Sequence, residues 1–480
     1  MLNKKLILNL IGFLLIVEGI LMLIPAVVSI IYHENDLLPF LKSSVITTFI
    51  GFFLWFITRN VKRAVGKREG FIIVTIVWII YSVFGSLPYI LSGSIPSFTN
   101  AFFETISGFT TTGASILNDI EALPHGILFW RSMTHLIGGM GILVLTVAIL
   151  PFLGVGGMQL FNAEASGITS DKLHPKMRET ARRLWGIYLL LIFIETILLK
   201  FGGMSLFDAL CHSFGTLASG GFSTKNASIA AFSPYIQYVV IFFMILAGTN
   251  FNLHYYLIKG KFRKIFKNQE YKFYILIILI STIIIAFFLV KNNGSIEKSF
   301  RDALFQVTSI VTCTGFVTAD YTGWAKFLWF FIFILMFVGG SVGSTSGGIK
   351  VLRHFLLFKN TITEFKRMLH PSAVIPVRYN GNVISNDIIF KVQAFFLSYL
   401  VIFITSSLLL TFFGMDFVSS MGAIVTTMGG IGPGLGTVGP VSNFALVPTA
   451  GKWLLSFMML IGRLEIFSVI IVFTPAFWEK

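Results

Sequence analysis

Four short segments of the chain combine small, apolar and hydroxyl-bearing residues, and each ends in a glycine. Each opens with a residue type that favours a helix N-cap, 13 positions before that glycine, and none contains a proline. This pattern predicts a short helix followed by a glycine turn. The four segments are residues 100–113, 208–221, 302–315 and 419–432.

The glycine turns carry the chemistry that the sequence offers. A helix of 13 residues spans about 20 Å, too short to cross a bilayer, so each should enter the membrane and stop part way. Its unpaired carbonyls and negative dipole end then face the centre, and glycine lets the next carbonyls turn inward. Uncharged oxygens suit a large monovalent cation better than Ca2+ or Mg2+, which usually recruit carboxylates. The predicted cation ligands are Thr111, Thr112, Gly113, Ser219, Gly220, Gly221, Cys313, Thr314, Gly315, Gly430, Ile431 and Gly432.

The elements that must position these turns are membrane helices. The 480 residues are 55% hydrophobic and only 12% charged. This composition excludes a water-soluble protein and predicts that the chain is embedded in the lipid bilayer, which is its expected partner. Since about 20 apolar residues cross a bilayer, the long apolar runs predict ten spans. We expect the first run to be a retained helix and not a cleaved signal peptide. The runs lie near residues 6–31, 43–58, 71–91, 127–153, 184–201, 233–258, 273–290, 325–358, 388–413 and 450–477.

The distribution of basic residues predicts how the chain is oriented across the membrane. The stretches 59–68, 172–183, 259–272 and 350–378 contain most of the lysines and arginines, and they alternate with poorly charged loops. By the positive-inside rule this bias predicts cytoplasmic N and C termini. Topology accounts for the basic loops, so no nucleic-acid partner is expected. The two cysteines and eight histidines do not have the spacing of metal ligands, and no Ser/His/Asp set is evident. We therefore expect that the protein is not an enzyme.

The predicted fold class is an all-α polytopic membrane protein. About ten transmembrane helices form four pseudo-symmetric helix, pore loop, helix repeats around one pore, preceded by two N-terminal helices. Irregular backbone is tolerated at membrane depth only where it is buried or lines a cavity, so four such turns on one axis should line a pore. The predicted units are a two-helix extension at 1–64 and repeats at 65–165, 166–265, 266–375 and 376–480.

A second chemical feature interrupts the third repeat. Residues 339–348, here called the glycine loop, contain five glycines and four hydroxyl residues, which a helix cannot hold at low cost. The predicted break lies beneath the glycine turns. Arg463 lies about 12 residues into the last span, where a charge needs a tertiary partner, and we expect carbonyls of this loop. The alternative is an arginine that only ties helices together. The gate candidates are Gly339, Gly340, Ser341, Gly343, Ser344, Thr345, Ser346, Gly347, Gly348 and Arg463.

Nearly the whole chain resembles the Trk/Ktr/HKT superfamily of potassium transport proteins, and within it the bacterial TrkH-type pore subunits. The two extra N-terminal spans favour the TrkH type over the shorter Ktr type. The resemblance rests on residues 107–113 (SGFTTTG), 130–151, 154–165 (GVGGMQLFNAEA), 220–224 (GGFST), 339–353 (GGSVGSTSGGIKVLR), 370–381 (HPSAVIPVRYNG), 432–436 (GPGLG) and 462–467 (GRLEIF).

The resemblance implies potassium uptake through a K+-selective filter, with K+ as the bound ion and no organic cofactor. Glycine in all four filter turns is associated with K+ selectivity in this family. The resemblance also implies that the glycine loop and Arg463 form a gate below the filter. Two departures are the segment 429–431, which reads Gly-Gly-Ile where TrkH proteins often have Asn-Asn-Leu, and Cys313 in the third turn.

The partners implied by the resemblance are a second pore subunit, giving a homodimer, and a cytosolic TrkA-type ring of nucleotide-binding subunits. The ring is expected to dock on residues 154–183, 259–272 and 350–387, and the implied location is the bacterial cytoplasmic (inner) membrane. The alternative function is a cation-coupled secondary active transporter that moves K+ with Na+ or H+, in which Glu195 is the candidate proton-coupling acid.

Overall fold

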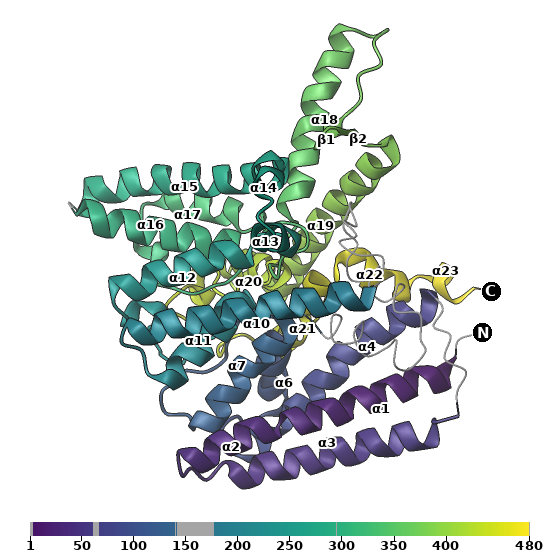
Figure 1. The fold of residues 1–480 in the computed structure, drawn as a ribbon, viewed down its shortest axis with the longest axis vertical. Coiled ribbons are helices and arrows are strands. Elements are labelled where there is room, and N and C mark those ends of the chain that lie inside the picture. The colour runs from purple at the N-terminus through teal and green to yellow at the C-terminus, as the bar shows by residue number, and fades with distance from the viewer. Residues whose placement is uncertain (1–2, 61–66, 140, 142–176, 294, 480) are drawn as a thin grey trace.

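The computed structural model describes residues 3–60, 67–139, 141, 177–293 and 295–479. The described chain is a helical bundle with one β-hairpin, whose two antiparallel strands are two residues long each, β1 (Arg378–Tyr379) and β2 (Asn382–Val383). The predicted all-helical membrane fold is confirmed. Figure 1 shows long, roughly parallel helices, from which α18 and the hairpin project, and both termini at one side.

The N-terminal extension consists of two packed spans. Helices α1 (Lys4–Leu21) and α2 (Leu23–Ile31) form the first span and α3 (Leu37–Ile57) the second. Small residues bring α1 and α3 together: a Cβ on Gly51 would lie 2.7 Å from the Gly12 carbonyl oxygen. The Tyr81 hydroxyl donates to the Leu14 carbonyl at 2.7 Å, which ties the extension to the first repeat.

Four groups of helices follow the extension, in the order that the repeats predict. Each contains a helix long enough to reach across the bundle, a short helix of 12 to 16 residues and a second long or broken helix. The first two groups are α4 (Lys67–Gly85), α5 (Leu87–Leu91), α6 (Phe98–Phe109) and α7 (His125–Gly139), then α10 (Met177–Phe201), α11 (Leu206–Leu217), η2 (Ser228–Ala231), α12 (Pro234–Ala247), α13 (Phe251–Ile258) and α14 (Phe262–Lys267).

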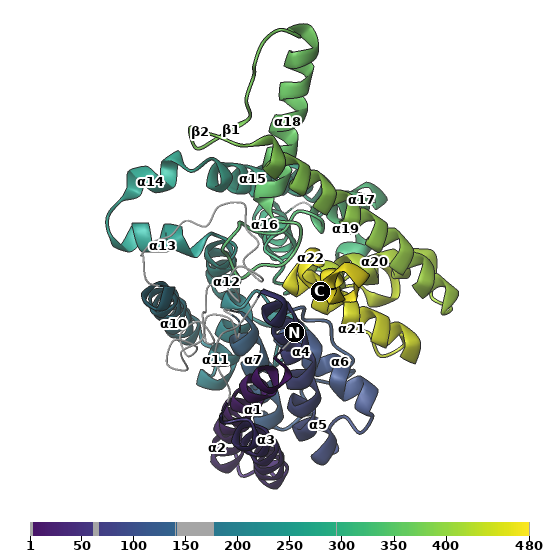
Figure 2. The same ribbon diagram turned by 90° about the vertical axis from the view of Figure 1, so that its right-hand side faces the viewer.

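The third and fourth groups have the same order. They are α15 (Gln269–Asn293), α16 (Ile296–Val311), η3 (Tyr321–Gly323), α17 (Lys326–Leu335) and α18 (Val351–Leu369), then α19 (Asn386–Phe412), α20 (Phe417–Gly429), η4 (Gly436–Val438), α21 (Thr449–Leu464), α22 (Ile466–Ile470), η5 (Ile471–Phe473) and α23 (Pro475–Trp478). Figure 2 shows the short helices α6, α11, α16 and α20 arranged in chain order around a common centre.

The exact domain boundaries stay predictions. The boundaries at 64/65 and 165/166 lie outside the described residues, the one at 265/266 falls within α14, and the one at 375/376 falls between α18 and β1. The motif at 154–165 and half of the motif at 130–151 also lie outside the described residues.

The short helices begin earlier than the sequence indicated. The predicted N-cap residues Asn100, Asp208 and Ser419 are the third residues of their helices, and the fourth, Asp302, lies farther inside α16. The true N-caps are Ser97, Ser205, Ser295 and Asp416. The prediction was wrong because an acidic or small polar residue suits the third helical position as well as the cap.

The predicted count of ten spans is not confirmed exactly by the described residues, which leave out residues 140 and 142–153 of the predicted span 127–153. Among the described residues six helices are long and apolar enough to cross a membrane, or eight if two bent helix pairs each count as one span. The runs 233–258 and 450–477, predicted as continuous spans, are broken by bends of 102° and 114°. The first bend follows Gly248, and the second lies at Glu465, where φ is 63°. Neither break carries a glycine-rich insertion, so hydropathy alone did not reveal it.

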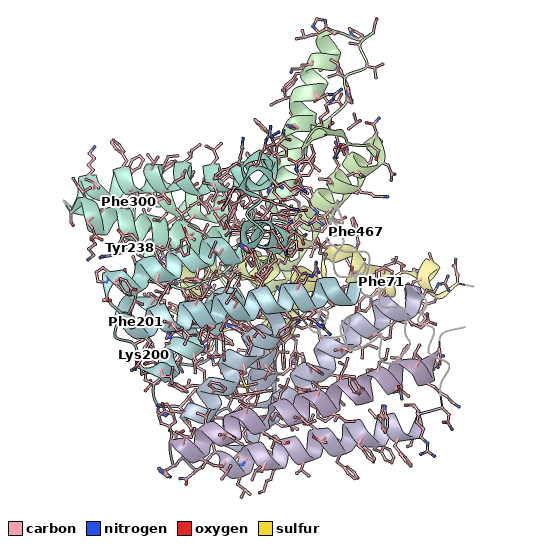
Figure 3. The ribbon with its side chains drawn as sticks, in the orientation of Figure 1. Phe71, Lys200, Phe201, Tyr238, Phe300 and Phe467 are labelled. Atoms are coloured by element: carbon pink, nitrogen blue, oxygen red, sulfur yellow. The ribbon has the colours of Figure 1, made fainter. Side chains whose placement is uncertain are left out.

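The outer surface of the bundle is apolar, as a lipid-facing surface should be. Large exposed hydrophobic side chains cover α3, α15 and α19, including Phe49 (68%), Phe287 (69%) and Leu408 (70%). Figure 3 places Lys200, Phe201, Tyr238 and Phe300 at one end of the bundle, and Phe71 and Phe467 toward the end with the termini. Tyrosine and lysine side chains, such as Tyr238 and Lys200, are typical anchors at a membrane interface.

Candidate functional site

The four glycine turns share one backbone conformation. Each short helix is followed by a residue in the left-handed region, with φ of 53° at Thr111, 54° at Ser219, 57° at Cys313 and 66° at Gly430. Three of these are not glycine, and the left-handed region costs such residues energy. Two positions later the backbone again has positive φ, at Gly113 (77°), Gly221 (76°), Gly315 (79°) and Gly432 (91°).

One hydrogen bond closes the helix end in all four turns. The N–H of the residue before each glycine donates to a carbonyl five residues back, at 2.8 to 2.9 Å. This is the 6→1 bond of a Schellman helix end, and it aims the following backbone away from the helix axis. The four bonds run from Thr112 to Ser107, from Gly220 to Gly215, from Thr314 to Ser309 and from Ile431 to Thr426.

The four turns contact one another in a closed ring. A Cβ on Gly113 would lie 2.0 Å from the Gly220 carbonyl oxygen, one on Gly221 2.1 Å from that of Thr314, and one on Gly315 1.8 Å from that of Ile431. The circle closes because a Cβ on Gly432 would lie 2.9 Å from the Thr112 carbonyl oxygen. Each glycine therefore packs directly on a carbonyl of the next repeat. We call residues 111–113, 219–221, 313–315 and 430–432 the filter turns.

The departure in the fourth turn has a local explanation. Gly430 occupies the left-handed position that Thr111, Ser219 and Cys313 occupy in the other turns. Glycine adopts this region without cost and asparagine tolerates it better than most residues, so either suits the position. The Cys313 side chain is buried and 4.0 Å from the Val311 carbonyl.

All four turns share one backbone conformation, but only the first and third carry a pair of hydrogen-bonded threonine hydroxyls. Thr110 and Thr112 share a hydrogen bond of 2.8 Å, and Thr312 and Thr314 share one of 2.7 Å. The second and fourth turns have Gly220 and Ile431 where the first and third have threonine, so they cannot form this pair. Backbone carbonyls are therefore the ligands that all four repeats can offer alike.

The glycine loop lies against the filter turns, as the sequence predicted. The Thr345 hydroxyl is 2.9 Å from the Ser219 hydroxyl and donates to the Leu217 carbonyl at 2.9 Å. A Cβ on Gly347 would lie 2.2 Å from the Gly429 carbonyl oxygen, and one on Gly348 3.5 Å from the Cys313 sulfur. The loop thus contacts the ends of three of the four short helices.

Neighbouring elements also hold the glycine loop. The N–H groups of Ser341 and Thr345 donate to the carbonyls of Gly248 and Ala247, at the bend between α12 and α13. The Glu270 carboxylate accepts from the Val342 N–H at 2.7 Å. Helix α17 ends at Leu335, three residues before the predicted break after Val338.

Arg463 connects the glycine loop to the first repeat. Its Nη1 donates to the Thr345 carbonyl at 2.9 Å, which is the kind of partner that the sequence predicted. Its Nη2 donates to the carbonyls of Gly138 and Gly139, the latter at 2.9 Å, where α7 ends. One guanidinium therefore bridges two repeats below the filter turns.

Sequence reasoning missed several residues around this bridge. The sequence placed no role on the carbonyls of Gly138 and Gly139, or on Arg353, whose guanidinium pairs with the Glu465 carboxylate at 2.6 Å and lies 3.9 Å from the Phe395 ring centroid. The pair joins α18 to the bend between α21 and α22. The available signal was Glu465, an acidic residue two positions after Arg463 in an apolar run. Its partner Arg353 lies 112 residues earlier in the chain, so the sequence did not reveal the pair.

One further candidate named from the sequence belongs to a long helix of the second repeat. Glu195, the candidate coupling acid, lies within α10 and is fully buried. In the described part of the chain no group of three or more His, Cys, Asp or Glu side chains could hold a metal ion.

Comparisons with known proteins agree on one family. The family model described as "TrkH: Cation transport protein" matches residues 38–480. The Trk system potassium uptake protein TrkH of Escherichia coli is 40% identical over 480 residues, covering 98% of this chain and 99% of that protein. Trk system potassium uptake protein TrkG of the same bacterium is 36% identical, covering 98% and 97%.

A solved structure has the same fold over the full length. The crystal structure of the potassium transporter TrkH from Vibrio parahaemolyticus matches with a TM-score of 0.89 and 36% sequence identity, covering 100% of both chains. The similarity therefore includes the extension, all four repeats and the glycine loop.

Proposed function

The chain belongs to the TrkH family of cation transport proteins, and we propose that it takes up potassium by conducting K+ selectively through one pore per subunit. The family is one of membrane transporters and not of enzymes. The observation that carries the proposal is the closed ring of filter turns, because four backbone strands meet there and each filter glycine packs against a carbonyl of the next repeat. Rings of backbone carbonyls replace the hydration shell of K+ in selective pores.

We place the bound K+ at the filter turns and the gate at the glycine loop with Arg463. Four short helices end at the ring, so the negative ends of their dipoles add to the attraction for a cation. The loop lies at the inner ends of these helices, and the Arg463 charge would repel a cation that leaves the filter. Moving the loop requires breaking the bond from Arg463 to the Thr345 carbonyl and the bonds of the Thr345 hydroxyl to Leu217 and Ser219.

We propose that the assembly is a homodimer regulated by a cytosolic TrkA-type nucleotide-binding ring. The name "Trk system" of the relatives supports further components. Helix α18 projects from the bundle and exposes Phe365 (63%), Met368 (76%) and Leu369 (77%), so it can contact other subunits. Residues 259–272 and 350–387 supply the basic docking surface, and most of 154–183 lies outside the described residues. The proposed location is the bacterial inner membrane with both termini cytoplasmic.

Reversal potentials of the purified protein in opposed K+ and Na+ gradients across liposomes test the function. A K+-selective pore sets the membrane potential near the K+ equilibrium value. A potential that follows the Na+ or proton gradient would favour the coupled transporter instead, and then Glu195→Gln should abolish the coupling.

A further inference from the structure

A second ring of contacts lies just beyond the filter glycines. Each carbonyl oxygen two residues after a filter glycine accepts a hydrogen bond from the preceding repeat. The order around the axis is the same as in the filter ring, so these bonds also close a circle, here called the collar. Its four bonds are Phe444 N to Ser115 O (2.8 Å), Arg131 Nη1 to Ser223 O (2.9 Å), Ala230 N to Val317 O (3.1 Å) and Tyr321 Oη to Gly434 O (2.8 Å).

Two kinds of donor alternate around the collar. Backbone N–H groups donate from the fourth repeat to the first and from the second to the third. Side chains donate at the other two junctions, through Arg131 and Tyr321. Any residue except proline supplies a backbone donor, so among the four collar donors only Arg131 and Tyr321 depend on the identity of a side chain. Side chains add separate bonds at the other two junctions, where Ser228 Oγ accepts from the Val317 N–H and Asn443 Nδ2 donates to the Leu117 carbonyl.

Arg131 is held in place by a buried carboxylate. Its Nε donates to Glu104 Oε1 at 2.7 Å, and the two side chains are 3% and 0% exposed. Glu104 belongs to the short helix α6, and it also accepts from the Ser115 hydroxyl and the Ile116 N–H, both at 2.9 Å. The Arg131 guanidinium lies 3.6 Å from the ring centroid of Phe222, which follows Gly221. Arg131 and Glu104 thus join the strands that leave the first and second filter turns.

The four short helices differ at the register that Glu104 occupies. His212 stands there in α11 and contacts the Ser223 hydroxyl at 2.9 Å, and Gln306 stands there in α16 and contacts Thr318 at 3.4 Å. The fourth helix has Ala423, which offers no polar atom. Tyr321, from the third repeat and 1% exposed, donates to the fourth strand instead.

We propose that Arg131 and Tyr321 are positioning residues that set the preference of the pore for K+ over Na+. The inference rests on the proposed function. The filter turns pack side by side, each glycine against a carbonyl of the next turn. The collar bonds fix how far each strand can slide past the next. A ring that can contract fits the smaller Na+ as well as K+ and therefore loses its discrimination between the two ions.

Tyr321→Phe tests the proposal with the loss of one hydroxyl. Tyr81→Phe is the matched control, because the Tyr81 hydroxyl is also buried and donates to a backbone carbonyl at 2.7 Å, but between α4 and α1. The permeability ratio of K+ to Na+ is measured from reversal potentials in liposomes. We expect the ratio to fall about two- to tenfold in Tyr321→Phe, the range that one buried hydrogen bond covers, and to stay at the wild-type value in Tyr81→Phe.

The arginine junction is tested by a variant that keeps the charge. Arg131→Lys leaves a cation beside Glu104, but an ammonium lacks the planar fork that serves Glu104 and Ser223 together. We expect the ratio to fall again. The control is Glu121→Gln, which removes an exposed ion pair with Lys225 at 3.5 Å between the same two repeats and should leave the ratio unchanged.

Thermal unfolding of all four variants separates positioning from folding. A merely structural role predicts that Tyr321→Phe and Tyr81→Phe lose similar stability and keep the same ratio, and this result would overturn the proposal. A Tyr321→Phe ratio equal to wild type in a protein that conducts K+ would also overturn it. A wild-type protein without any K+ preference would contradict the proposed function itself, so the two failures are distinguishable.

Discussion

At the scale of single residues, the filter glycines are not equivalent. Three of them lie against a neighbouring carbonyl so closely that a Cβ would overlap it, whereas the nearest atoms to a Cβ on Gly432 are 2.9 Å away. Gly432 also has the largest φ of the four, 91°. The ring therefore has one junction with slightly more room.

Gly113→Ser should weaken the preference for K+ over Na+. The Cβ would meet the Gly220 carbonyl oxygen at 2.0 Å and displace it, and the hydroxyl adds a ligand of its own. Gly432→Ser should have a smaller effect. Gly93→Ser is the control for backbone strain alone, since φ is 75° there and nothing lies within 4 Å. Rb+ and Na+ fluxes in liposomes measure the ratio, and equal ratios in Gly113→Ser and Gly93→Ser would contradict the role of Gly113.

Arg463→Ala should raise K+ flux in the absence of any cytosolic partner. The substitution removes the bonds to Thr345, Gly138 and Gly139 together with the charge below the filter. The K+ to Na+ ratio should stay close to wild type because the filter turns are untouched. Arg463→Lys should stay partly closed if charge dominates, and should open if the planar fork matters. Abolished flux in a folded protein would identify Arg463 as a packing residue instead.

At the scale of elements, the glycine loop is held by contacts and not by helix propensity. Each glycine in a helix interior costs about 1 kcal/mol relative to alanine, so five of them leave no stable helix. The loop is instead tied to the bend after α12, to α15 and to α21. An element held at several points by weak bonds can move as a unit when they break.

Thr345→Val should loosen the loop and raise basal flux. Valine has nearly the shape of threonine but cannot form the hydroxyl bonds to Leu217, Ala247 and Ser219. About 1 kcal/mol of holding energy is lost per bond, so a several-fold increase in K+ flux is expected. Thr363→Val is the control, because the Thr363 hydroxyl bonds only within α18, to the Lys359 carbonyl. Flux that rises equally in both variants would argue against Thr345 as a holding residue.

At the scale of the whole molecule, the predicted orientation places the loops that follow the filter turns on the outer side of the membrane. It places the basic loops on the cytoplasmic side. Ala122→Cys, in the loop after the first filter turn, should react with an impermeant thiol reagent added outside intact cells. Arg263→Cys, in α14, should react only after the cytoplasmic side is opened. Both native cysteines are buried, so they should contribute little labelling. Labelling of both positions from the same side would refute the predicted orientation.

The sequence by itself determined the membrane class and the helical fold, and it located the four glycine turns, whose role as a filter stays a prediction. Apolar runs identify helices because the bilayer has a fixed thickness. A short proline-free run that ends in a glycine identifies a half-length helix with its turn, although the N-cap residues were wrongly predicted. The glycine loop was visible because its composition is incompatible with a helix. These signals are local, so they need no knowledge of neighbours.

Tertiary structure alone decided how the repeats meet. The bends after Gly248 and at Glu465 occur in runs whose hydropathy is continuous, because contacts from other repeats and not composition stabilise them. The partners of Arg463 at α7 and of Arg353 at Glu465 lie 324 and 112 residues away. The collar pairs backbone carbonyls with donors of four different residue types, and a carbonyl leaves no trace in a sequence. Such contacts exist only once four similar units close around an axis, which is why the folded chain and not its pattern specifies them.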